Sequence, residues 1–134
     1  MKLILYTDGG ARGNPGPAAI GIVLMDPGKG VLEEVGEYIG ETTNNVAEYR
    51  ALLKGLELAL QHECTELDVY SDSQLLVRQL LGEYKVKAAH LKPLFAEIQK
   101  KAEQFTSIAF THVLRDHPGV SHADRLVNDA LDEH

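Results

Sequence analysis

The order of hydrophobic patterns along the chain restricts the fold more than any other feature of the sequence. Three apolar runs, at residues 3–8, 18–25 and 31–39, have the lengths and residue types of β-strands. The turn-forming stretch 26–30, with one proline and two glycines, joins the last two runs. We therefore expect the chain to begin with an antiparallel meander of three strands.

The stretch from Gly9 to Pro17 interrupts this pattern after the first run. It contains four glycines and two prolines among nine residues, which disfavours both helix and strand. We therefore expect residues 9–17 to form a loop.

The hydrophobic period changes to that of a helix after residue 42. Tyr49, Leu52, Leu53, Leu56 and Leu60 repeat at helical spacing, and residues 42–45 (Thr-Thr-Asn-Asn) offer capping side chains before them. The remaining predicted elements are a strand at 67–71, a helix from 72 to 82, a helix at 91–105, a strand at 108–114 and a helix at 121–131.

Strand–helix alternation after a meander predicts an α/β fold with one five-stranded mixed sheet. Three strands would form the antiparallel meander, two would be parallel, and helices would cover both faces. Because no repeat or linker interrupts the chain, we expect a single domain over residues 1–134.

Four acidic residues fall where this topology brings distant segments together. Asp8 and Asp72 follow strands that are expected to be parallel neighbours, and the carboxyl ends of such strands form ligand-binding crevices. Glu48 and Asp124 are expected in the first turns of helices. All four carboxylates could then face one crevice.

Each acid also has an ordinary structural explanation. Asp8 could be a turn residue, and the other three could serve helix N-termini. The capping alternatives are Asn45 with Glu48, Ser121 with Asp124, and Asp72 alone.

Taken together, the four acids favour a metal site. A lone ionised carboxylate at the end of an apolar strand is costly unless it is paired or bound to a metal. Oxygen ligands suit hard cations such as Mg²⁺ or Mn²⁺. Two such ions about 4 Å apart can activate water and stabilise the leaving oxygen of a phosphodiester, which indicates phosphoryl transfer to water.

The composition bears on the partners of the chain. A formal charge of −7 argues against tight binding to a polyanion, although a metal-binding cluster would account for about four of the negative charges. Cys64 is the one cysteine, and no apolar stretch approaches the roughly 20 residues of a membrane span. We expect a cytoplasmic monomer with no membrane association and no obligate protein partner.

Four sequence blocks resemble the signature of type 1 ribonuclease H, in the order found in that family. The blocks are Thr7-Asp8-Gly9-Gly10 with Gly13-Asn14-Pro15-Gly16-Pro17, Thr43-Asn44-Asn45-x-x-Glu48, Ser71-Asp72-Ser73-Gln74, and Ala123-Asp124-x-Leu126. The resemblance implies the ribonuclease H-like fold and hydrolysis of the RNA strand of RNA–DNA hybrids with two Mg²⁺ or Mn²⁺ ions, leaving 5′-phosphates. It assigns the metal to Asp8, Glu48, Asp72 and Asp124.

The resemblance also implies substrate contacts. The positions that match the family's hybrid-binding segments are Arg12, Gly13, Asn14, Thr43, Asn44, Asn45 and Gln74. Thr43 resembles part of a pocket for a DNA phosphate, and the two asparagines serve equally well as helix caps. Among the histidines, His117 is the candidate for assisting proton transfer, in a Pro-Gly segment expected to be a mobile loop. His122 would at most cap or shield Asp124.

One departure from the family concerns substrate binding. Some members insert a helix and a basic loop, the basic protrusion, where this chain has only residues 83–90, so Lys85 and Lys87 are the local candidates for phosphate binding. Two alternatives therefore stay open. One is a nuclease that prefers double-stranded RNA or RNA–DNA junctions; the other is a catalytically silent nucleic-acid-binding module.

Overall fold

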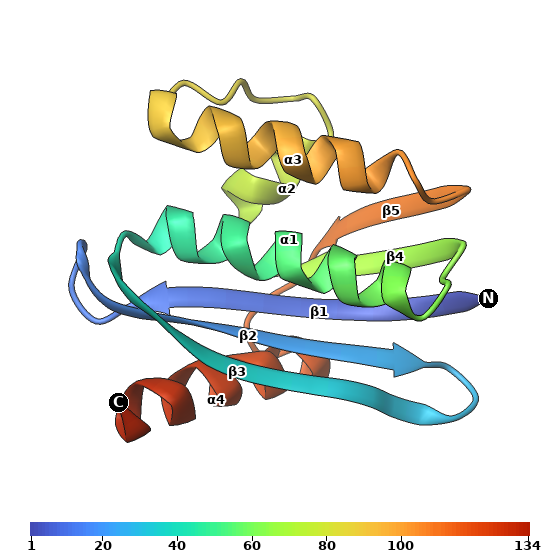
Figure 1. Ribbon diagram of the computed structural model, residues 1–134, viewed down its shortest axis with the longest axis horizontal. Helices are drawn as coiled ribbons and strands as arrows, with labels where there is room; N and C mark the ends of the chain where they lie inside the picture. The colour runs from blue at the N-terminus through green and yellow to red at the C-terminus, as the bar shows by residue number, and fades with distance from the viewer.

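The computed structural model describes residues 1–134 and is organised around one five-stranded sheet (Figure 1). The strands are β1 (Lys2–Ala11), β2 (Gly16–Asp26), β3 (Gly30–Thr42), β4 (Glu66–Ser71) and β5 (Ser107–His112). Their order in the sheet is β3-β2-β1-β4-β5. The helices are α1 (Asn44–Gln61), α2 (Gln74–Leu80), α3 (Lys92–Ala102) and α4 (Pro118–Glu133), with a 3₁₀ turn, η1, at Ala89–Leu91.

The pairing of the strands confirms the predicted mixed sheet. β1, β2 and β3 form the antiparallel meander, whereas β4 lies parallel to β1, and β5 lies parallel to β4. Helices α1, α2 and α3 lie on one side of the sheet, with α1 against the strands and α3 packed on α1, and α4 covers the other side, so helices lie on both faces as expected (Figure 1).

Most of the buried apolar side chains lie between the sheet and α1. Leu3, Leu5 and Ile22 from the strands meet Leu52 and Leu56 from α1, and all five are at most 1% exposed. Burial of an aliphatic side chain of this size contributes roughly 2 kcal/mol relative to leaving it exposed. A smaller cluster of Ala19, Val127 and Leu131 joins α4 to the opposite face. No helix is long and apolar enough to cross a membrane.

The predicted loop over residues 9–17 is wrong in extent. Strand β1 continues through Ala11 and β2 begins at Gly16, so the connection is only residues 12–15. Gly10 and Ala11 pair with Ala19 and Ala18 in the antiparallel ladder. Gly9 is suited to this strand because the backbone of α1 approaches it closely.

The last helix begins three residues earlier than predicted. Pro118 occupies its first turn, where a fixed φ and a missing N–H cost nothing, and His117 is its N-cap. Ser121 therefore lies inside α4, and the predicted Ser121–Asp124 capping box is wrong. Similarly, Thr43 caps α1 by accepting a hydrogen bond from the Val46 N–H, which corrects the predicted Asn45–Glu48 box.

The remaining boundaries differ by a few residues. The cap of α2 is Ser73, whose Oγ accepts a hydrogen bond from the Leu76 N–H, so Asp72 is left free of the capping role that was considered for it. Helix α3 ends at Ala102 rather than near 105, and β5 ends at His112 rather than at 114.

Two glycines bring helix backbones into contact with the sheet. A Cβ atom on Gly9 would lie 2.3 Å from the Ala47 carbonyl carbon of α1, and one on Gly21 would lie 2.1 Å from the Ala123 carbonyl oxygen of α4. Neither position has room for a methyl group. The residues that follow these contact points along the helices are Glu48 and Asp124.

We predict that Gly21→Ala lowers the free energy of unfolding by roughly 2–3 kcal/mol, because the added methyl group collides with the backbone of α4. The measurement is chemical denaturation of the metal-free protein. Gly28→Ala is the control, since a Cβ there meets nothing closer than 3.5 Å. Equal stability of the two variants would show that the contact at Gly21 is looser than described.

Candidate functional site

The four predicted acids converge on one place at the sheet. Asp8, Glu48 and Asp72 each offer a carboxylate oxygen, and these oxygens lie within 4.8 Å of one another. The carboxyl group of Asp124 shares a hydrogen bond with that of Asp8. These residues come from β1, α1, the end of β4 and α4.

The register of the parallel strands places the two aspartates at the same level. Tyr6 of β1 pairs with Tyr70 of β4, and Asp8 and Asp72 each follow two residues later. Strand β4 ends at Ser71, so Asp72 lies just beyond the end of its strand. Ligands bind at this end of parallel strands in open α/β sheets.

The environment of Asp8 disfavours its charged form. The residue is 5% exposed, and one of its oxygens, Oδ1, is buried without any hydrogen-bond partner. Burial, the hydrogen bond with Asp124 and the negative charges of Asp72, Asp124 and Glu48 raise the pKa of Asp8 from 3.8 to about 8. In the absence of metal, Asp8 therefore holds a proton at neutral pH.

Glu48 is perturbed in the same direction by a smaller amount. Burial raises the pKa of Glu48 from 4.5 to about 7, a hydrogen bond with Ser73 lowers it, the charge of Asp72 raises it, and Arg115 lowers it. Strongly perturbed carboxylates in a cleft are typical of functional sites.

The donor set suits a hard divalent cation. It consists of carboxylate oxygens, without thiolate or imidazole, and the unpartnered Oδ1 of Asp8 is a buried acceptor that a cation would satisfy. Asp8, Glu48 and Asp72 are therefore the residues placed to hold such an ion, with Asp124 adjacent.

Three polar residues around the acids had no predicted role at this site. Arg115, between β5 and α4, donates from Nε to Asp72 Oδ2 at 2.9 Å. Asn128 donates to the Asp124 carbonyl at 3.1 Å and to its Oδ2 at 3.4 Å. Ser73, the N-cap of α2, lies close enough to Glu48 to lower the pKa of that carboxyl group. The i, i+4 spacing of Asp124 and Asn128 was a usable signal, whereas nothing in the sequence pairs Arg115 with Asp72.

The predicted substrate residues of the β1–β2 turn form hydrogen bonds and an ion pair with neighbouring elements. Asn14 Oδ1 accepts a hydrogen bond from the Asn44 N–H at 3.1 Å, and Asn44 Oδ1 accepts one from the Ala11 N–H at 2.8 Å. Arg12 forms an ion pair of 2.7 Å with Asp132 near the end of α4. Arg12 and Asn44 line the acidic cleft together with Asp8, Glu48, Arg115 and Asp124.

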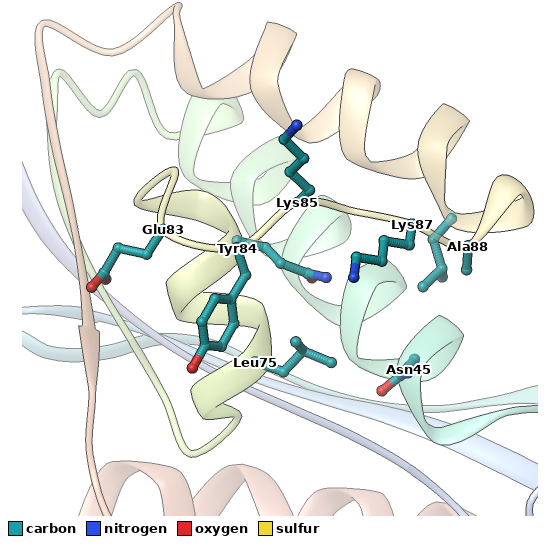
Figure 2. A pocket seen from close by; sticks show the side chains of 9 residues that line it. Asn45, Leu75, Glu83, Tyr84, Lys85, Lys87 and Ala88 are labelled. Atoms are coloured by element: carbon teal, nitrogen blue, oxygen red, sulfur yellow. The ribbon is translucent and has the colours of Figure 1, made fainter.

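A second groove lies next to the cleft, between the start of α1, helix α2 and residues 83–91. Asn45 of α1 borders it, with Leu75 and Tyr84 opposite and Lys85 and Lys87 on the connecting segment (Figure 2). Both lysines are exposed and neither forms an ion pair. The neighbouring residues Asn44 and Asn45 therefore face different hollows.

Two more of the predicted substrate residues lie at helix starts near this groove. Thr43 is the N-cap of α1, and Gln74 is the exposed first residue of α2. Gly13, in the turn after β1, has a φ of 98°, which suits glycine. Gly13, Thr43 and Gln74 line neither the cleft nor the groove.

His117 was expected in a mobile loop but is the N-cap of helix α4. The predicted Pro-Gly loop is wrong, because Pro118 and Gly119 form the first turn of α4. The His117 ring packs against Tyr6 and Tyr70, with centroid separations of 5.4 and 5.7 Å, and its Nδ1 accepts a hydrogen bond from the Gly119 N–H. His117 is not among the residues that line the acidic cleft. His122 faces away from the acids and contacts Glu34 at 3.2 Å.

Comparison with known proteins assigns the chain to a family. Residues 6–130 match the family described as Reverse transcriptase-like. A bifunctional protein of Mycobacterium tuberculosis is 45% identical over 98% of this chain, and the chain spans 36% of that relative's length.

Two solved structures share the fold over nearly their full length. Ribonuclease H1 of the archaeon Halobacterium salinarum has a TM-score of 0.94 at 37% identity, covering 100% of both chains. LC11 ribonuclease H1, isolated from compost and solved in complex with an RNA/DNA hybrid, has a TM-score of 0.89 at 47% identity, covering 98% of this chain and 97% of that one. The chain has the ribonuclease H-like fold and belongs to the ribonuclease H family.

Proposed function

We propose that this chain is a divalent-metal-dependent endonuclease that hydrolyses the RNA strand of RNA–DNA hybrids. The observation that carries the proposal is the convergence of four carboxylates around a buried Asp8 oxygen that lacks a partner. Membership of the ribonuclease H family supports the reaction class, and the hybrid bound by the LC11 enzyme supports the substrate.

The proposed metal ligands are Asp8, Glu48, Asp72 and Asp124. We propose Mg²⁺ or Mn²⁺ as the ions, with two per site. When bound, the ions supply activation of the attacking water and stabilisation of the leaving oxygen. In the overall reaction the water oxygen bonds to phosphorus and the bond to the RNA O3′ breaks, so the products carry a 3′-hydroxyl and a 5′-phosphate.

The chain's own residues would orient this reaction. Asn128 holds the Asp124 carboxylate through its side-chain amide, and Ser73 lies beside Glu48. Asp8 itself is almost completely shielded from bulk water. Such pre-positioned groups favour a reaction because they need little rearrangement when charge develops.

Two neighbouring hollows suit the two strands of a hybrid. We propose that the RNA strand lies over the acidic cleft, beside Arg12 and Asn44, and that the DNA strand follows the groove, where Lys85 and Lys87 are free to bind phosphate. Thr43, Asn45 and Gln74 lie between or beside these paths. Recognition would then rest on groove shape and 2′-hydroxyls rather than on base sequence.

The role of His117 in assisting proton transfer stays a prediction. Its Nε2 has no hydrogen-bond partner and is the atom that could accept or donate a proton. Since Tyr6 and Tyr70 hold the ring, taking part in the reaction would require it to leave these contacts. The location in the cytoplasm and the monomeric state likewise stay predictions.

We predict that Asp8→Asn lowers cleavage of the RNA strand by at least about a hundredfold, because a metal ligand loses its charge. The assay uses a labelled hybrid with Mg²⁺ or Mn²⁺, and excess chelator should abolish wild-type cleavage. Asp129→Asn, an exposed carboxylate of α4 outside the cluster, is the control and should cleave like wild type. Wild-type turnover by Asp8→Asn would contradict the assignment.

Further arms of the same assay separate the alternatives. Double-stranded RNA and an RNA–DNA junction, given at equal concentration, should be cut more slowly than the hybrid. Faster cleavage of either would make it the preferred substrate. Binding of the hybrid without cleavage under any metal would support a silent binding module.

We predict that the metal-free protein loses stability as the pH rises from about 5 to about 8. The folded-state pKa values of Asp8 (about 8) and Glu48 (about 7) exceed their values of 3.8 and 4.5 as free side chains. The folded state therefore binds more protons than the unfolded state in this range, and the free energy of unfolding falls with pH. The contribution of Asp8 is on the order of a few kcal/mol.

The measurement compares wild type with Asp8→Asn by chemical denaturation at pH 5 and pH 8 in chelator. The stability of the variant relative to wild type should increase with pH, since asparagine does not titrate. A difference independent of pH would contradict the account of Asp8.

A further inference from the structure

Arg115 is the one cation in direct contact with the acidic cluster. Its Nε lies 2.9 Å from Asp72 Oδ2, whereas the other arginine of the cleft, Arg12, pairs with Asp132. The two partners differ sharply in exposure: the Arg115 side chain is 70% exposed and that of Asp72 is 8% exposed. A nearly buried carboxylate is therefore compensated by a cation that reaches it from solvent.

The backbone near Arg115 is held by hydrogen bonds, whereas its guanidinium is largely exposed. The Ser121 hydroxyl donates to the Arg115 carbonyl at 2.8 Å, and the Val113 N–H donates to the Ser71 carbonyl at 3.0 Å. The guanidinium makes one hydrogen bond, to Asp72, and has further N–H groups facing outward. These groups lie at the cleft that would receive the substrate backbone.

The charge of Arg115 reaches the other acids as well. Arg115 lines the same cleft as Asp8, Glu48 and Asp124. In the absence of metal this interaction offsets part of the repulsion within the cluster. A divalent cation bound to the same acids would instead be repelled by it.

We propose that the Arg115 guanidinium neutralises part of the acidic cluster in the metal-free protein and competes with divalent metal for Asp72. When metal binds, the guanidinium leaves Asp72 and binds a substrate phosphate. This rests on the proposed function, because it takes the acids to be the metal site. A guanidinium suits this exchange, since its planar fork fits carboxylate and phosphate equally well. Arg115 would then contribute to substrate binding in the metal-loaded enzyme and restrain metal binding in the free enzyme.

The competing explanation is that Arg115 only orients Asp72. Removing an orienting partner of a metal ligand weakens metal binding, commonly by about 10- to 100-fold. Removing a competing charge strengthens it. The sign of the change in metal affinity therefore distinguishes the two roles.

The experiment titrates Mn²⁺ into metal-free wild type, Arg115→Gln and Arg115→Lys by calorimetry at low ionic strength. Arg115→Gln keeps a hydrogen-bond donor and removes the charge, so we expect Mn²⁺ to bind about tenfold more tightly. Arg115→Lys keeps the charge and should bind Mn²⁺ like wild type. Arg125→Gln, a change of charge on the exposed part of α4 outside the cleft, is the control and should also match wild type.

Hybrid cleavage at saturating Mn²⁺ supplies the second readout. We expect Arg115→Gln to raise KM about tenfold with a smaller change in kcat, because a phosphate contact is lost. Unchanged or weaker Mn²⁺ binding by Arg115→Gln, or an unchanged KM, would overturn the proposal while leaving the metal site intact. Failure of wild type itself to bind Mn²⁺ would overturn the proposed function and this inference with it.

Discussion

The approach of two helices to glycines in the sheet is the constraint on which the acidic cluster depends. Gly9 on β1 admits the backbone of α1 at Ala47, and Gly21 on β2 admits the backbone of α4 at Ala123. Glu48 and Asp124 follow these contact points directly. Because Gly9 adjoins Asp8 in sequence and Gly21 pairs with Asp8 in the ladder, both approaches are centred on the same carboxylate. A side chain at either glycine would push away the helix backbone next to Glu48 or Asp124.

Bringing four carboxylates together creates electrostatic repulsion, which protonation and one arginine reduce in the metal-free protein. Burial, together with the repulsion among the four carboxylates, raises the pKa values of Asp8 and Glu48, and Arg115 pairs with Asp72. The same acids contribute to the formal charge of −7, which opposes a polyanionic substrate at long range. Bound cations would reverse the local charge, and this makes an acidic protein compatible with a nucleic-acid substrate.

The sequence predicted the parts of this structure that depend on pattern and strand order. The five strands, their mixed pairing and the meeting of four acids follow from hydrophobic period and parallel register. The extent of the loop at residues 9–17 could not be predicted, because glycine in a strand and glycine in a turn look alike until the neighbouring backbone is known. Arg12 and Arg115 pair with residues of other elements, and no local sequence pattern predicts these pairs. The contact of Asn128 with Asp124 could be predicted only from their helical spacing.

Anomalous diffraction from crystals containing Mn²⁺ would show whether the carboxylates around Asp8 share divalent cations. We expect anomalous peaks among the carboxylate oxygens of Asp8, Glu48, Asp72 and Asp124, at about the 2.0–2.6 Å typical of oxygen coordination to hard cations. Crystals at saturating Mn²⁺ that show no peak at these acids, or peaks only elsewhere on the surface, would contradict the proposed metal site.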